Sequence, residues 1–320
     1  MPAGAGPVAP RVETGPAPLS VTQEQLWYFN QLAPESPVYN EAVTIRKDGA
    51  FDPTAFRLAF NELLRRHEIW RTTFELVDGE PVQVVGPPPQ FPLPLLDLSS
   101  LSSDAAQARA TELTAADFSR PYELDRGPLV RPHLVRLAAD HHRLYLGLHH
   151  IVFDGVTLSR VILPELITLY DDTVAGRPPS FAEPTIQYSD YAVWERAWVA
   201  TPVVTSRTEW WRQHLSDVQP LELPLDRPRP AVPRFRGGME SFTLEQEVVD
   251  GLRGLGRRQG ATLFQTLAAG FAALLHRYSG QEDVTFGTVG DLRQRPELQH
   301  LVGYSITPLV LRADLRDDPT

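Results

Sequence analysis

The sequence predicts an α+β protein of two lobes, and three observations lead to this prediction. The chain has 320 residues, which is too long for one ordinary small core and suits two lobes of roughly 100–200 residues each. Helix-like and strand-like segments are mixed without the strict alternation of a parallel βαβ sheet. A stretch rich in proline, "AGRPPSFAEP" (175–184), interrupts the pattern. We therefore expect an N-terminal lobe over 19–178 and a C-terminal lobe over 179–320, each a mixed sheet with packed helices.

Composition and charge exclude several classes of protein. The net charge of −10 does not predict an electrostatic footprint for nucleic acid. The chain has no cysteine, which excludes disulfides, thiol nucleophiles and zinc–thiolate sites and suits the cytoplasm. The most apolar window (261–278) is interrupted by Gln265, Thr266 and His276 and is shorter than the ~20 apolar residues of a membrane span. We expect a buried helix there and no membrane partner.

The first elements can be placed from their capping and turn residues. The first 18 residues contain five prolines and predict a disordered leader. A helix over 19–32 opens at a Ser/Thr cap, and a second over 51–70 has Asp52 as its cap and Pro53 in its first turn. Two β-rich runs around Asp78-Gly79 (71–85) predict a hairpin.

The later elements follow from hydrophobic periodicity. Pro132 interrupts the first of two strands and suggests an edge or a bulge there. The remaining predicted elements are helices over 103–118, 156–172, 186–198, 207–215 and 261–278, and strands over 127–137, 142–150, 282–290 and 306–315.

The residues most suited to catalysis or binding lie at the junction between a strand and the next helix, in "HHIVFDG" (149–155). Strand alternation places His149 and His150 on opposite faces, so both cannot serve one small site without a bulge. Asp154 can cap the following helix, and Gly155 permits a positive φ or the close approach of a ligand. The histidines do not have a metal-binding spacing such as HExxH, and we expect no metal. The serine-hydrolase, P-loop and Rossmann motifs are absent as well.

"HHIVFDG" resembles the HHxxxDG motif that condensation domains of nonribosomal peptide synthetases share with chloramphenicol acetyltransferase. Four further segments resemble condensation-domain motifs in sequence, order and spacing. They are "LSVTQEQLWYFNQL" (19–32), "RRHEIWRTTFE" (65–75), "YSDYAVWERAW" (188–198) and "GTVGDLRQRPELQHLVG" (287–303). The resemblance extends from Leu19 to Arg312.

The resemblance implies two chloramphenicol acetyltransferase-like lobes in a V, with the active site in a tunnel between them. Donor and acceptor peptidyl carrier proteins would enter the tunnel from opposite faces, each delivering a thioester on its phosphopantetheine arm, and the domain would need no cofactor of its own. The amine of the downstream aminoacyl thioester would attack the upstream acyl thioester and form an amide. Adjacent adenylation or polyketide synthase modules would be further partners.

The resemblance also implies roles for individual residues. His150 would act at the amine, either as a general base or by positioning it, while His149 would be structural. Asp154 would form a buried ion pair with Arg293, and Gly155 would lie beside the reacting centre, where a side chain would obstruct it.

Two departures from the family pattern bear on activity. The segment that usually resembles "VGxFxNT" reads "VGYSITP" (302–308), so that Thr307 and Pro308 replace the usual asparagine and threonine. The chain ends at Thr320, before the later family motifs, so we expect an incomplete second lobe from a longer synthetase. A non-catalytic docking module for carrier proteins and a stand-alone coenzyme A-dependent acyltransferase are the alternative interpretations.

Overall fold

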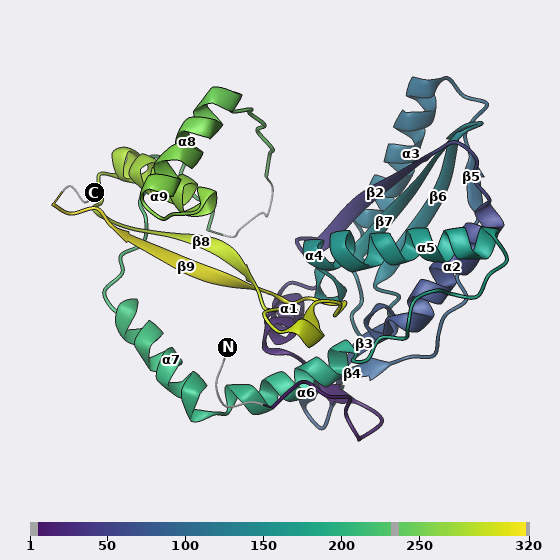
Figure 1. Cartoon of the computed structure of the whole chain (residues 1–320), viewed down its shortest axis with the longest axis horizontal. Coiled ribbons are helices and arrows are strands. Elements are labelled where there is room, and N and C mark those ends of the chain that lie inside the picture. The colour runs from purple at the N-terminus through teal and green to yellow at the C-terminus, as the bar shows by residue number, and fades with distance from the viewer. Residues whose placement is uncertain (1–5, 232–236, 318–320) are drawn as a thin grey trace. The chain divides into compact units, whose positions relative to one another are not determined.

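The computed structural model describes residues 6–231 and 237–317 (Figure 1). The chain divides into two compact units, a first unit of residues 1–207 and 291–306 and a second unit of residues 208–290 and 307–320. The segments 179–207 and 291–306 thus cluster with the first unit. The expected assignment of 19–178 and 179–320 to two lobes stays a prediction.

A mixed four-stranded sheet forms the centre of the first unit. Its strand order is β2 (Asn40–Asp48), β7 (His141–His149), β6 (Val130–Ala138) and β5 (Leu95–Asp97). The pairs β2–β7 and β7–β6 are antiparallel, whereas β5 is parallel to β6. Because β7 lies inside the sheet, neighbouring strands hold both of its edges, and its carboxyl end delivers the motif residues from a rigid position.

Helices cover both faces of this sheet (Figure 1). The core on one face joins α2 (Pro53–Arg66) and α5 (Leu163–Val174) to Leu144, Leu146 and Leu148 of β7. On the other face α3 (Ser103–Phe118) packs against Val135, Leu137 and Tyr145. The alternation predicted for the strand at 142–150 is therefore confirmed, since leucines face one layer of helices and Tyr145 faces the other.

Local capping residues set the helix starts that the sequence predicts. Ser20 caps α1 (Val21–Leu32) by accepting a hydrogen bond from the Gln23 N–H, and the two residues form a capping box. Asp52 caps α2 by accepting from Thr54 N–H, with Pro53 at the first helical position. Both starts are confirmed.

The predicted hairpin joins β3 (Thr72–Val77) to β4 (Glu80–Val85). Asp78 and Gly79 have φ angles of 53° and 86°, the left-handed region that a tight hairpin turn requires. A short strand, β1 (Ala17–Pro18), pairs with β4 and completes a small three-stranded sheet.

The strand has no bulge at Pro132, but the expected edge position is met locally, although β6 is an inner strand of the sheet. Pro132 sits in β6, between β7 and β5, and the register shift of that strand falls later, between Arg136 and Ala138. Only residues 134–136 of β6 pair with the short β5. At Pro132 the strand therefore has one neighbour, so the missing N–H interrupts no ladder on the β5 side.

The helix expected over 156–172 contains a local irregularity. The chain runs from a short 3₁₀ turn, η2 (His150–Val152), into α4 (Gly155–Thr157), one π-helical stretch (Leu158–Ile162) and then α5. Single π-helical turns inside α-helices occur often at functional sites. The remaining elements of the first unit and of the segment that leaves it are η1 (Glu68–Arg71), α6 (Tyr188–Val199), α7 (Pro202–His214) and η4 (Pro296–Leu298).

Part of the leader expected to be disordered over 1–18 packs against the first unit in the structure, at residues 6–18. Val8 and Ala17 are buried, with 6% and 2% of their surface exposed, and β1 belongs to a sheet. Residues 1–5 lie outside the described residues. The proline content explains the difference, because a fixed φ lowers the entropy lost when an extended segment docks.

The second unit contains α8 (Gln246–Arg258), α9 (Leu263–Ser279) and a two-stranded sheet of β8 (Asp283–Asp291) and β9 (Ile306–Asp314). The helix predicted at 261–278 exists, but its expected burial is wrong. Only two of its residues are buried, whereas Phe264, Leu267, Phe271 and Leu274 are 43–56% exposed. These exposed apolar residues recur at intervals of three and four and so share one face of α9, which its described neighbours leave largely uncovered. No helix in the described part of the chain has the length and apolar character needed to cross a membrane.

Candidate active site

The two motif histidines occupy different environments at the end of β7. His149 is the last residue of the strand and is 3% exposed, with its ring centroid 6.2 Å from that of Tyr39 and 5.9 Å from that of Tyr122. His150 begins η2 and is partly exposed, between the rings of Phe153 and Tyr304 at 5.1 and 5.0 Å. The histidine pair therefore does not converge on one site, in agreement with the alternation of the strand.

One hydrogen bond defines the tautomer of His150. Its Nδ1 atom lies 2.9 Å from the carbonyl oxygen of Phe153. A carbonyl oxygen can only accept, so Nδ1 carries the proton and donates it. In the neutral ring Nε2 then holds the lone pair, and it is the atom of His150 that can accept a hydrogen bond or a proton.

His149 has the opposite arrangement. Its Nδ1 atom accepts a hydrogen bond from the Ile151 N–H at 3.2 Å, so the neutral ring carries its proton on Nε2. Burial, reinforced by the neighbouring His150, lowers the pKa of His149 from 6.5 to about 3. The ring is therefore neutral at physiological pH, and the lone pair on its Nδ1 atom is already used.

Asp154 is completely buried and all of its partners are hydrogen-bond donors. Its Oδ1 atom accepts from the Thr157 N–H at 2.8 Å and thereby caps α4. Its Oδ2 atom accepts from Arg293 Nη2 at 2.9 Å and from the Ser305 N–H at 2.8 Å. Asp154 thus both caps a helix and pairs with the arginine that the sequence motifs indicate.

Arg293 is 6% exposed and donates to several acceptors besides Asp154. Its Nη2 atom lies 2.6 Å from Thr157 Oγ1 and 2.9 Å from the carbonyl oxygen of Gly303, and its Nε donates to the Leu301 carbonyl at 3.0 Å. A buried charge requires such a complete set of partners. The guanidinium group therefore ties the turn after β7 to the segment 291–305.

Two glycines of the site have opposite surroundings. A Cβ atom on Gly155 would meet no atom within 4 Å, and its φ is not positive, so the turn itself does not require glycine there. Gly303 has a φ of 148°, and a Cβ would lie 2.0 Å from Tyr188 Cδ2. Its carbonyl also accepts from Arg293 and from Thr157 Oγ1.

Sequence reasoning missed Thr157, Gly303 and Ser305 as parts of the site. Gly303 is the last residue of the segment 287–303 that resembles a family motif, and this position was the available signal. Thr157 and Ser305 carry no local signal, because their role depends on contacts across 136 and 151 residues of chain.

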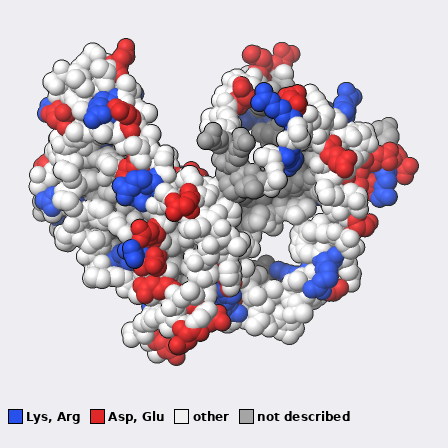
Figure 2. Space-filling view, turned by 180° about the vertical axis from the view of Figure 1, so that it is seen from behind, with Lys and Arg blue, Asp and Glu red and all other residues white. Residues whose placement is uncertain are grey.

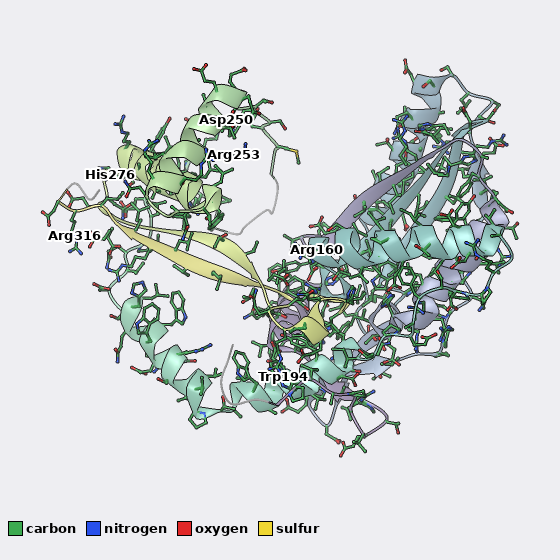
Figure 3. All side chains as sticks on the ribbon, viewed as in Figure 1. Arg160, Trp194, Asp250, Arg253, His276 and Arg316 are labelled. Carbon is green, nitrogen blue, oxygen red and sulfur yellow. The ribbon has the colours of Figure 1, made fainter. Side chains whose placement is uncertain are left out.

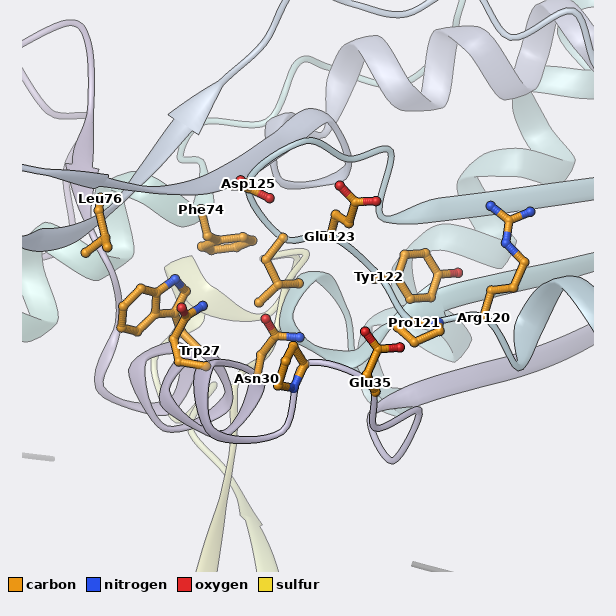
Figure 4. Close-up of a pocket in the computed structure, with 13 residues that line it drawn as sticks. Trp27, Asn30, Glu35, Phe74, Leu76, Arg120, Pro121, Tyr122, Glu123 and Asp125 are labelled. Atoms are coloured by element: carbon orange, nitrogen blue, oxygen red, sulfur yellow. The ribbon is translucent and has the colours of Figure 1, made fainter.

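Two cavities of the first unit lie close to these residues. A cavity of about 300 Å³ lies beside the ion pair and is lined by Arg160, Asp291, Arg293, Gln299 and His300 (Arg160 in Figure 3). A second, of about 640 Å³, has aromatic and apolar walls that include Trp27, Phe74 and Tyr122, and an acidic rim (Figure 4). Tyr122 contacts His149, but His150 lines neither cavity.

The charged side chains on one face of the molecule and the possible metal ligands of the described residues indicate no second site. Acidic and basic side chains are interspersed on the face shown in Figure 2. Within residues 6–231 and 237–317, no group of three or more histidine, aspartate or glutamate side chains is arranged to hold a metal ion.

A mixed sheet that delivers an HHxxxDG motif from its central strand, with the motif aspartate paired to a distant arginine, defines an α+β protein of the condensation-domain class. The chain belongs to this family, since the model of the condensation domain matches residues 13–320. The resemblance seen in the sequence and the α+β fold class are both confirmed.

The sequence relatives are large synthetases. The chain is 39% identical over 315 residues to a linear gramicidin synthase from Brevibacillus parabrevis, covering 98% of this chain and 4% of that protein. It is 40% identical over 315 residues to phosphinothricin tripeptide synthetase PhsC from Streptomyces viridochromogenes, covering 97% of this chain and 29% of that protein. The chain thus spans a small part of these relatives.

Solved structures show the same fold. The X-domain in complex with OxyB from teicoplanin biosynthesis superimposes with a TM-score of 0.87 at 27% identity, covering 99% of this chain and 69% of that chain. The first condensation domain of the CDA synthetase gives a TM-score of 0.78 at 23% identity, covering 96% and 73%. The second similarity concerns the fold alone.

Proposed function

We propose that this chain catalyses amide bond formation between an upstream acyl or peptidyl thioester and the amine of a downstream aminoacyl thioester. The observation that carries the proposal is the oriented His150. Its Nδ1–H is held by the Phe153 carbonyl, and its Nε2 lone pair is left for the substrate, at the motif position of the condensation-domain family.

In the proposed reaction the amine nitrogen attacks the thioester carbonyl carbon and forms a tetrahedral intermediate. The intermediate collapses as the carbon–sulfur bond breaks, the amine loses one proton, and the leaving sulfur ends as a thiol. His150 Nε2 accepts an N–H hydrogen bond from the amine, and it either takes that proton or holds the nitrogen in line. A general base supplies ~10²–10⁴-fold. Holding the two carrier-bound reactants in register is the task of the whole site and not of His150 alone, and it supplies effective molarities of ~10⁵ M or more.

Asp154 and Arg293 do not contact the reacting atoms in this scheme and act as positioning residues. Their ion pair fixes the turn that follows His150, and His149 anchors the same turn through the Ile151 N–H. Gly155 leaves open space where any other residue would project a Cβ.

The partners in this proposal are donor and acceptor peptidyl carrier proteins that bring the phosphopantetheine arms, with adjacent adenylation or polyketide synthase modules. The domain then needs no cofactor of its own. The synthetase relatives support this assignment. We place the reaction in the cytoplasm.

A second candidate is a non-catalytic module of the same fold that docks other proteins. The specific observation in its favour is the similarity to an X-domain that was solved in complex with OxyB. The segment "SITP" (305–308), which departs from the family pattern, also favours it.

The deciding experiment combines the chain with an acyl-loaded donor carrier and an aminoacyl-loaded acceptor carrier, and detects the amide by intact mass spectrometry. The variants are His150→Ala and, as a matched control, His133→Ala, which removes a partly exposed histidine that pairs with Asp117. Product that disappears only with His150→Ala supports the enzyme. Carrier binding without product supports the docking module, and product from acyl-coenzyme A as the donor supports a stand-alone acyltransferase.

A further inference from the structure

Residues 6–18, named the strap here, are held against α6 and the turn at 295–297. All these residues belong to the first unit. Three hydrogen bonds attach the strap at successive points along its length. They are Trp194 Nε1 to Gly6 O at 2.9 Å, Val8 N to Glu297 Oε1 at 3.3 Å and Arg11 N to Asp190 Oδ1 at 2.9 Å (Trp194 in Figure 3).

The strap has one inward side. Val8 is 6% exposed and belongs to the hydrophobic core of the first unit, whereas Val12 is 97% exposed. Two valines four residues apart in the same segment thus have opposite environments. Burial of an apolar side chain stabilises in proportion to the area removed from water, so Val8 is the main apolar anchor of residues 6–12.

The two carboxylates that accept hydrogen bonds from the strap, in the groove that receives it, are each fixed by a second hydrogen bond to a neighbouring residue. Asp190 Oδ2 accepts from the Gln187 N–H at 2.7 Å at the start of α6, which leaves Oδ1 for Arg11. Glu297 Oε1 accepts from Arg295 Nε at 2.7 Å as well as from the Val8 N–H. The Arg295 guanidinium in turn lies 5.3 Å from the ring centroid of Trp194. The acceptors are therefore pre-oriented before the strap binds.

The chemistry of the groove fits an extended, proline-rich peptide. Prolines stand at 7, 10, 16 and 18, and an indole N–H donates to a strap carbonyl. Aromatic grooves recognise pre-extended proline-rich segments by this combination in other proteins, because little backbone entropy is lost. Residues 6–12 lie outside the match to the condensation-domain model, which begins at residue 13.

The same turn leads directly to the buried arginine of the site. Glu297 lies four residues after Arg293, and Leu298 and Leu301 between that turn and Gly303 are buried. We propose that α6 and the 295–297 turn form a peptide-docking groove for the strap, and that docking holds the segment 291–303 and thereby positions Arg293 against Asp154.

The test uses the full chain with Val8→Asp and, as a matched control, Val12→Asp. Hydrogen–deuterium exchange with mass spectrometry reports on peptides that cover 6–18 and 293–303. With Val8→Asp we expect exchange of both regions to rise about tenfold or more, since a buried carboxylate undocks the strap. Val12→Asp should change neither region. Unchanged protection of 293–303 with Val8→Asp, or equal effects of the two variants, would overturn the proposal.

A milder variant and a rescue keep the test informative if Val8→Asp disturbs folding. Trp194→Phe retains a ring but removes the N–H donor to Gly6, and it should raise exchange of the strap while α2 and β7 stay protected. A synthetic peptide of residues 6–16, added to the Val8→Asp chain, should restore protection of 293–303, and the same peptide with aspartate at position 8 should not. A native peptide without effect contradicts the docking groove.

The structural part of this inference is independent of activity, whereas its link to catalysis rests on the proposed function. The strap variants should lower the rate of amide formation in proportion to the lost protection of 293–303. If the variants show the expected exchange pattern but the native chain never forms amide, the docking of the strap is supported and the proposed enzymatic function is refuted. If the native chain forms amide but the strap variants leave the exchange pattern unchanged, the proposed role of the strap is refuted.

Discussion

Arg293 Nη2 lies 2.9 Å from Asp154 Oδ2, and the two side chains are 3% and 0% exposed although 139 residues of chain separate them. This pair joins the turn that follows the histidine motif to the segment 291–305. Because both charges are removed from water, each depends on the other for its stability.

Asp154→Ala should destabilise the fold by roughly 3–5 kcal/mol, since it leaves the Arg293 charge buried without its partner. His150→Ala should change stability far less, because that ring is partly exposed. Thermal unfolding of both variants checks the expectation. Asp154→Asn serves as a control that keeps the Oδ1 cap on Thr157. Equal melting temperatures for the two alanine variants would contradict it.

Stability should fall on acidification partly because of His149. Burial, together with the neighbouring His150, lowers its folded pKa to about 3, so below the unfolded value of 6.5 the unfolded chain binds a proton that the folded chain does not. Its contribution is thus complete above pH 6.5 and decreases toward pH 3 by about 1.4 kcal/mol per pH unit.

His149→Asn removes the titrating ring and keeps an acceptor for the Ile151 N–H. Denaturant unfolding at several pH values between 6.5 and about 4 should give a shallower pH dependence for this variant than for the native chain. If the unfolding free energy of both proteins depends on pH in the same way, the titration of His149 does not cause the loss of stability in acid.

Alanine at Gly303 should destabilise the fold, whereas alanine at Gly155 should not. Gly303→Ala places a Cβ 2.0 Å from Tyr188 Cδ2 and disturbs an acceptor of Arg293, so we expect a loss of about 1–3 kcal/mol or more. Gly155→Ala projects into open space and should leave stability within about 0.5 kcal/mol, while it lowers amide formation in the proposed reaction. The comparison of unfolding free energies decides this, and equal losses would refute it.

Rescue by a small molecule can separate the two roles of His150. If Nε2 removes the proton, His150→Ala should lower the rate by ~10²–10⁴-fold, and added imidazole should restore part of it with a dependence on the concentration of its neutral form. A positioning role predicts a smaller loss and no rescue. The readout is amide formed per unit time at saturating carrier concentrations, compared with His133→Ala.

The sequence by itself determined the local elements and the identity of the motif residues. Ser20, Asp52 and the Asp78-Gly79 turn specify their helix starts and hairpin through bonds to residues at most a few positions away. Strand alternation in the same way separated His149 from His150. Such features depend on interactions between residues that are close in the sequence, so the sequence alone specifies them.

Only the tertiary structure decided which residues are buried and which distant groups meet. The apolar pattern of α9 predicts burial, yet neighbours cover few of its side chains. The proline-rich start predicts disorder, yet Val8 is buried and the segment around it bonds to α6 and to Glu297. Gly303 is required because Tyr188 lies against it, and Thr157 because Arg293 reaches it. The physical reason is common to all four: burial and buried hydrogen bonds depend on contacts between segments far apart in the chain, and local propensity carries no record of them.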